Sequence, residues 1–188
     1  MTYLSDSNFS SKDFTSEGFS TIDYEHCTFD QCKFSTLDLR GSSFENCTFL
    51  NCDLSNLKVP GVSFRGVTFK NCKMLGIHFQ SSNVFLLDFV FENCQMDYCS
   101  FYNLKIKGTK FIGCRMTEVD FTEATISSSD FHKSDLSGAI FERTDLVNAD
   151  FRNASNFRIN PETNRIKGAK FNIDGLPGLL TSYGIKIS

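Results

Sequence analysis

Cysteine is the residue of this sequence best suited to chemistry, because eight cysteines stand in a chain of 188 residues. Most lie twenty residues from another, which would align their thiols in any structure that turns at that interval. A ladder of thiols could bind a soft metal or undergo redox chemistry. Zinc, however, needs four converging ligands, typically from short C-x-x-C pairs, and a parallel column does not converge. We therefore interpret the thiols as small hydrophobic side chains and expect no metal and no cofactor. The aligned sets are Cys27 with Cys47, Cys32 with Cys52 and Cys72, and Cys94 with Cys114.

The remaining candidates for catalysis form no recognisable arrangement. His26, His78 and His132 show no metal-binding spacing such as H-E-x-x-H. No G-x-S-x-G motif and no glycine-rich phosphate loop occurs. The sequence thus predicts no catalytic residue, and we expect a protein that is not an enzyme.

Charge and hydropathy exclude further classes of protein. Nineteen basic and 22 acidic residues give a net charge of −3, without the basic excess of a nucleic-acid-binding protein. The longest apolar run, residues 84–87, is far too short to span a bilayer. The first residues carry no basic stretch followed by an apolar one, so we expect a cytoplasmic protein with reduced thiols.

The chain instead has an aromatic excess, with 21 Phe and no Trp. Large hydrophobic residues recur every five residues, a period that fits neither an α-helix nor a simple strand. We call these positions centres. The first series is Phe9, Phe14, Phe19, Tyr24, Phe29, Phe34, Leu39, Phe44, Phe49, Leu54, Val59, Phe64, Phe69, Met74 and Phe79. The second is Phe91, Met96, Phe101, Ile106, Phe111, Met116, Phe121, Ile126, Phe131, Leu136, Phe141, Leu146 and Phe151.

A second series of small residues lies two positions before the centres. Between Ile22 and Ala149 none of them is charged, so we expect both series to point inward. All eight cysteines fall on this small position. Asp or Asn often precedes the centre, as is typical of a chain that turns at every unit. Such units can bury a continuous core only by stacking, as in a solenoid.

These units resemble the pentapeptide-repeat family, whose idealised unit is A-(D/N)-L/F-x-x. Residues 149–153 (Ala-Asp-Phe-Arg-Asn) and 134–138 (Ser-Asp-Leu-Ser-Gly) are good matches, and the resemblance covers roughly residues 7–155. It implies an all-β solenoid, a right-handed quadrilateral β-helix of twenty residues per coil and roughly seven coils. We assign residues 1–157 to the β-helix, with a register break at 80–90. Residues 158–188 would form a loop, a last repeat and a short helical tail for capping and dimerisation.

Two irregularities stand out along the repeat. The interval from Phe79 to Phe91 is twelve residues, so this seam holds two extra residues and forms either a tolerated bulge or a loop that binds a partner. The second hypothesis makes Ser81, Ser82, Asn83 and Phe85 candidate partner-binding residues. Pro60-Gly61 marks a modified corner that keeps the five-residue spacing.

The two ends of the chain also depart from the pattern. Glu17 occupies a small inward position, which predicts a loose first coil. Near the other end, Asp174 is placed to cap a short helix that Gly184 ends. The tail is more apolar than a cap requires, so we expect a homodimer through it. The residues assigned to capping and dimerisation are Leu176, Leu179, Leu180, Tyr183, Ile185 and Ile187.

Function is suggested by resemblance to one branch of the family, the Qnr quinolone-resistance and microcin-immunity proteins. The resemblance lies in residues 159–171 followed by a leucine-rich end. It implies a dimeric rod that mimics DNA, binds DNA gyrase or topoisomerase IV, and protects it from quinolones or a peptide toxin. Glu25, Asp30 and Glu45 are the candidate acids, although Arg65 and Lys70 follow in their columns. The alternative is a scaffold of this fold with an unrelated protein partner.

Overall fold

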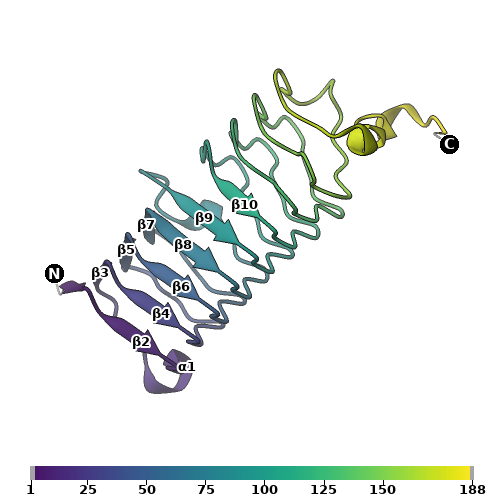
Figure 1. Ribbon diagram of the computed structural model, residues 1–188. Coiled ribbons are helices and arrows are strands. Elements are labelled where there is room, and N and C mark those ends of the chain that lie inside the picture. Colours follow the sequence, from purple (N-terminus) through teal and green to yellow (C-terminus); the bar gives the residue numbers. More distant parts are fainter. Residues whose placement is uncertain (1–2, 187–188) are drawn as a thin grey trace.

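The computed structural model of the chain describes residues 3–186. Short parallel strands stack into a rod with the two ends of the chain at opposite ends (Figure 1). One sheet has the order β1-β3-β5-β7 and the other β10-β9-β8-β6-β4-β2. The first sheet contains β1 (Tyr3–Ser5), β3 (Asp23–Glu25), β5 (Ser43–Glu45) and β7 (Ser63–Arg65). The second contains β2 (Asn8–Ser10), β4 (Thr28–Asp30), β6 (Thr48–Leu50), β8 (Val67–Lys70), β9 (Phe89–Glu92) and β10 (Lys110–Ile112).

Parallel pairing runs along four faces of the rod, which confirms the solenoid. Face 1 carries the first sheet and resumes at Lys105↔Thr125, and face 2 carries the second sheet. Face 3 begins at Asp13↔Lys33, and face 4 begins at Asp38↔Lys58. Face 2 shows eight successive pairs, Asn8↔Thr28, Thr28↔Thr48, Thr48↔Thr68, Thr68↔Val90, Val90↔Lys110, Lys110↔Asp130, Asp130↔Asp150 and Asp150↔Lys170.

The core is a set of aromatic columns. Phe111 is fully buried and stacks on Phe91 and Phe131, with ring centroids 5.2 and 5.1 Å away and nearly parallel planes. Its contact with Phe121 of the neighbouring column is edge-to-face, with centroids 5.7 Å apart at 79°. Both geometries are favourable for aromatic rings. Successive coils therefore stack equivalent rings above one another in this column.

Two kinds of unit occur along the chain. In a turn unit, the N–H three residues after the centre donates to the carbonyl of the centre, as from Ala139 to Leu136 (3.0 Å). In an open unit the centre lies within a strand, and in most of these units its carbonyl accepts from the small inward side chain of the next coil. The Cys52 thiol donates to the Phe29 carbonyl in this way, at 3.2 Å. The exceptions are Phe44, because the next-coil residue is Val67, and Phe64, which accepts from the Asp88 N–H at 3.2 Å. Open units lie on face 1 up to β7 and on face 2 up to β10, and residues 116–155 consist almost entirely of turn units.

The seam changes the step of the solenoid from twenty to 22 residues. Strand β8 pairs with β9 through Val67↔Phe89 and Phe69↔Phe91. The two extra residues lie between η1 (Phe79–Ser81) and β9. Pairing thus continues on face 2, while the strand column of face 1 stops at β7.

The expected position of Glu17 was wrong. A single helical turn, α1 (Phe14–Glu17), replaces the regular unit, and Asp13 caps it by accepting from the Thr15 N–H at 3.1 Å. This turn rotates Glu17 to the surface, where it forms an ion pair with Lys12 at 3.1 Å. A charged side chain thereby avoids the cost of burial.

The tail consists of two 3₁₀ helices, η2 (Ile173–Leu179) and η3 (Thr181–Tyr183). The expected cap at Asp174 was wrong, because Asn172 precedes the helix and Asp174 lies in its first turn. Gly184 ends η3 in the left-handed conformation, φ 62°, as predicted. Before the tail, pairing extends to Asp150↔Lys170. The helices within residues 3–186 are far shorter than a bilayer is thick, so none of them could span a membrane.

Candidate functional site

The interior of the rod is filled. All eight cysteines are buried, and no group of three or more potential metal ligands occurs within residues 3–186. Burial raises the pKa of Cys47 to about 11 and that of Cys99 to about 12. Because the thiolate is the reactive form, these thiols are poor nucleophiles near neutral pH.

One thiol contact was missed in the sequence. A single column runs Cys32, Cys52, Cys72, Cys94 and Cys114, because the 22-residue seam brings Cys94 above Cys72. Hydrogen bonds with Cys52 and Cys94, followed by burial, raise the pKa of Cys72. The sequence could have predicted this column, because the two extra residues at the seam change the spacing from twenty to 22 in every column that crosses it.

The candidate acids lie on the outer surface of faces 1 and 2, in the columns expected. Glu25 pairs in register with Glu45, and Glu45 with Arg65. Arg65 forms an ion pair with Glu45 at 2.8 Å, and the Tyr3 hydroxyl donates to Glu25. The acidic columns are therefore short, and a base or a hydroxyl contacts their carboxylates.

The neighbouring column on face 2 follows the same rule. Asp30 lies in register with Leu50, which lies in register with Lys70. The side-chain amide of Asn51 donates to Asp30 at 3.0 Å. Lys70 in turn pairs with Glu92 at 3.1 Å.

Beyond the seam, arginines form ion pairs with five of the twelve acids, namely Asp97, Glu123, Glu142, Asp145 and Asp150. Arg115 Nε donates to Asp97 Oδ2 at 2.8 Å, and the Thr117 N–H donates to the same buried carboxylate. Three further pairs are Arg143–Glu123 (2.7 Å), Arg152–Asp150 (2.7 Å) and Arg165–Asp145 (3.0 Å). Arginine thus offsets much of the negative charge on this half of the rod.

The candidate residues at the seam differ in exposure. Ser82 is buried, with its hydroxyl donating to the Phe79 carbonyl, whereas Ser81 and Asn83 are exposed. The Phe85 side chain is 70% exposed, and its N–H donates to Asn83 Oδ1 at 3.1 Å. Sequence reasoning missed Val84 and Leu86, which are also exposed. Their membership of the longest apolar run was the available signal.

The tail residues divide between packing and exposure. Leu179 packs against the core and Leu180 is half-buried. Leu176, Tyr183 and Ile185 are exposed, as is Ile173, which sequence reasoning missed. Ile187 lies outside the described residues. The tail therefore covers part of the last coil and presents apolar side chains outward.

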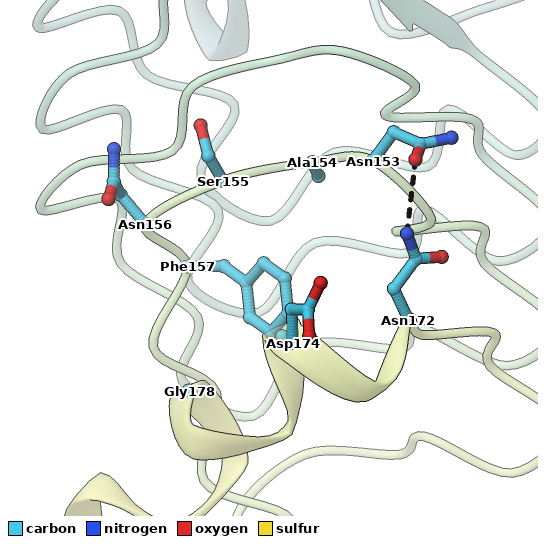
Figure 2. Close-up of a pocket in the computed structure, with 9 residues that line it drawn as sticks. Asn153, Ala154, Ser155, Asn156, Phe157, Asn172, Asp174 and Gly178 are labelled. Atoms are coloured by element: carbon cyan, nitrogen blue, oxygen red, sulfur yellow. Dashed lines mark hydrogen bonds between the residues drawn. The ribbon is translucent and has the colours of Figure 1, made fainter. Parts of the chain in front are cut away.

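A hollow of about 460 Å³ lies between the last coil and η2 (Figure 2). Asn172 Nδ2 donates to Asn153 Oδ1 at 3.0 Å, and Phe157 and Asp174 also line the hollow. No His, Lys, Arg or Cys lines it. Its amides, one hydroxyl and one carboxylate could bind a small polar molecule, but they provide no nucleophile paired with a base.

Comparisons with known proteins agree with this geometry. A family model described as pentapeptide repeat region matches residues 2–79 and 42–111. A second, described as pentapeptide repeats (8 copies), matches residues 106–143 and 114–153.

Two solved structures of trypsin-treated variants of QnrB1, a plasmid-mediated fluoroquinolone resistance protein, share the fold. One has a TM-score of 0.67 at 18% identity, and the alignment covers all of both chains. The other has a TM-score of 0.73 at 19% identity, and the alignment covers all of this chain and 92% of that chain. A search of curated protein sequences found no match.

Proposed function

Because this chain belongs to the pentapeptide-repeat family, whose models match it between residues 2 and 153, we propose that it is a non-catalytic rod that binds another protein through its surface. One observation carries this proposal. The aromatic columns and buried thiols fill the interior, so the outer faces are the surface available to a partner. Solenoids commonly use their extended faces for binding.

We further propose that the partner is DNA gyrase or topoisomerase IV in the cytoplasm. The rod would occupy the path of duplex DNA and protect the enzyme from quinolones or a peptide toxin. Two features support this choice, the fold shared with QnrB1 and the outward carboxylates Glu25, Asp30 and Glu45 on neighbouring faces. Electrostatic complementarity would then steer the rod toward a basic DNA-binding surface.

A supercoiling assay tests this partner directly. Purified gyrase is supplied with relaxed plasmid, with and without a quinolone, and this protein is titrated in. We expect inhibited supercoiling and fewer quinolone-stabilised DNA breaks. The variant E25Q/D30N/E45Q should lose both effects, while the charge-matched control E118Q/E142Q/E162Q should keep them. No inhibition, no protection and no binding to gyrase would refute the topoisomerase as partner.

An unrelated protein partner is the second candidate, and the ion pairs favour it. Arg65 on face 1 and Lys70 on face 2 interrupt the acidic columns, so no continuous acidic stripe resembles a DNA backbone, which carries one charge per ~1.7 Å. If the three acids can be neutralised without any loss of gyrase binding, the mimicry fails and this second candidate remains.

We propose that the rod is a homodimer joined through its tail, since Leu176, Tyr183 and Ile185 are exposed together. Deleting residues 174–188 should halve the mass found by sedimentation. That deletion also removes the Gly178 carbonyl that accepts from the Ile159 N–H (3.0 Å) and could loosen the last coil. The double variant L176D/I185D, which leaves this bond intact, should therefore also be monomeric. An unchanged mass for both variants would refute tail-mediated pairing.

A further inference from the structure

The seam exposes an unusual apolar segment. Val84, Phe85 and Leu86 are 65%, 70% and 55% exposed, the only three consecutive large hydrophobic residues so exposed within residues 3–186. A run of this kind on a soluble domain favours aggregation unless it serves an interface. We call residues 84–86 the apolar finger.

The finger is held in place from both sides. On its N-terminal side, the Asn83 N–H donates to the Val62 carbonyl at 2.9 Å. On its C-terminal side, Leu87 packs against the core and the Asp88 N–H donates to the Phe64 carbonyl at 3.2 Å. A segment with both ends fixed loses little conformational entropy on binding.

Leu86 adds backbone strain to this arrangement. Its φ is +59°, and it is the only aliphatic residue among the non-glycine residues with positive φ within residues 3–186. Bulky side chains avoid this region, and strain of this kind clusters at functional sites. Leu86 thus combines a strained backbone conformation with an exposed aliphatic side chain.

A groove of about 460 Å³ lies just before the finger, on face 4. Its floor is apolar, formed by Leu57, Val59 and Pro60. We call it the seam groove. Ser81 lines the groove and is three residues before Val84 in the sequence. At most about 10 Å of extended chain therefore separates the groove from the finger.

The rim of the seam groove is basic. Arg40, Lys58 and His78 line it, against the single acid Asp38, which pairs with Arg40 at 3.5 Å. Lys58 forms no ion pair with any residue in the described part of the chain. Its ammonium group is therefore free to meet a carboxylate from another molecule.

We propose that the seam groove and the apolar finger form one interaction surface for an extended, acidic segment of a partner protein. An acidic side chain of the segment lies at Lys58, and a large apolar side chain packs against Phe85. Charge complementarity with the basic rim selects an acidic segment, and the apolar floor and finger provide the buried area. This inference rests on the binding role proposed above, and it requires no topoisomerase.

A protein segment fits better than an anionic membrane. Three apolar side chains bury too little area to hold a protein on a bilayer, where even one myristoyl chain gives only marginal binding. A groove with an apolar floor also has no use on a flat surface. Vesicle binding is nevertheless one outcome of the test below.

Selection from a displayed library of random twelve-residue peptides tests the surface. The full chain is immobilised, and the enriched peptides are measured by fluorescence anisotropy against purified variants. We expect enrichment of Asp or Glu together with Leu, Ile, Phe or Trp. The Kd should rise at least tenfold for F85S and for K58Q, and it should rise with salt only for the wild type and F85S.

Two variants serve as matched controls. I140S removes another exposed aliphatic side chain, and K133Q removes another exposed lysine, both away from the seam. Each should bind the selected peptides as the wild type does. Unchanged melting temperatures for all four variants would show that they remain folded.

Three outcomes would overturn the proposal. The first is selection without acidic enrichment, or without any enrichment. The second is peptide binding that F85S and K58Q leave unchanged. The third is Phe85-dependent sedimentation with vesicles of phosphatidylglycerol and phosphatidylcholine in the absence of peptide binding. The gyrase assay is scored separately, so loss of supercoiling inhibition alone does not decide this surface.

Discussion

Two regions of the rod provide different hydrogen-bond donors to the backbone carbonyl of the centre residue. On face 1 up to β7 and on face 2 up to β10 the units are open, and in most of them a side chain from the next coil donates to the centre. In residues 116–155 the backbone closes a turn at almost every unit, as from Ala149 to Leu146 (3.0 Å), and donates to the centre itself. Buried carbonyls must be paired, so each region needs its own donor.

This difference explains where cysteine occurs. Each of the eight thiols donates to a backbone carbonyl of the preceding coil, for example Cys72 to Phe49 at 3.3 Å. Most turn units lack such a donor, and alanine occupies the small position at Ala124, Ala139 and Ala149, although Thr144 Oγ1 donates to the Phe121 carbonyl at 2.9 Å. The thiols are therefore small, buried hydrogen-bond donors as well as hydrophobic side chains.

The aromatic core is common to both regions, and truncating it should have the largest effect. Phe111 lies in an open unit and Phe131 in a turn unit of the same column, and both are fully buried. We expect F111A and F131A each to lower the free energy of unfolding by roughly 3–5 kcal/mol, through lost contacts and a cavity. Urea titration measures this, with exposed F85A as control. A near-zero loss would refute the inward assignment.

A hydroxyl pair tests the carbonyl argument itself. Ser134 Oγ donates to the Phe111 carbonyl at 2.7 Å and accepts from the Cys114 N–H at 2.9 Å. S134A should therefore lower the free energy of unfolding by roughly 1–3 kcal/mol, because it leaves buried groups unpaired.

Ser129 is the matched control, since its buried hydroxyl has no partner and its unit closes a turn to Ile126. S129A should leave the stability unchanged or raise it. If both variants lowered the free energy of unfolding equally, the side-chain donor would not matter more in open units than in turn units.

Alkaline pH should lower stability through the buried thiols. Burial raises the pKa of Cys47 to about 11 and of Cys99 to about 12, above about 8.5 in an unfolded chain. The unfolded state loses these protons first, so their stabilisation is complete below pH ~8.5 and is lost as pH rises toward the folded values. We expect roughly 1 kcal/mol lost per thiol between pH 8 and 9.5.

Denaturant titrations at several pH values measure this slope. The variant C47A/C99A should show a shallower decline than the wild type, whatever its absolute stability. An identical slope would mean that these thiols titrate alike in the folded and unfolded states.

The sequence predicts the fold because its period is a physical requirement. One large and one small inward residue per five can be buried only by stacking, which places Phe111 and Cys114 correctly. The period could not predict the helical turn at Phe14–Glu17, where a local cap at Asp13 prevails over the repeat. Arg65 was located in the column of Glu45, but the Asp97–Arg115 ion pair was hidden, because the two residues are 18 apart and do not share a column. The candidate loop was located, but its exposed side chains depend on backbone geometry.

The seam described above also removes an ambiguity. A stack of equal coils has near-perfect translational symmetry, so displacing one half against the other by a whole coil would still set Phe on Phe and Thr on Thr. A single 22-residue coil breaks that symmetry, because a displaced stack would align it with a twenty-residue neighbour and pair Val67 with the wrong residue. The two extra residues thereby fix the register of the stack, so that only one alignment of the coils pairs every strand correctly.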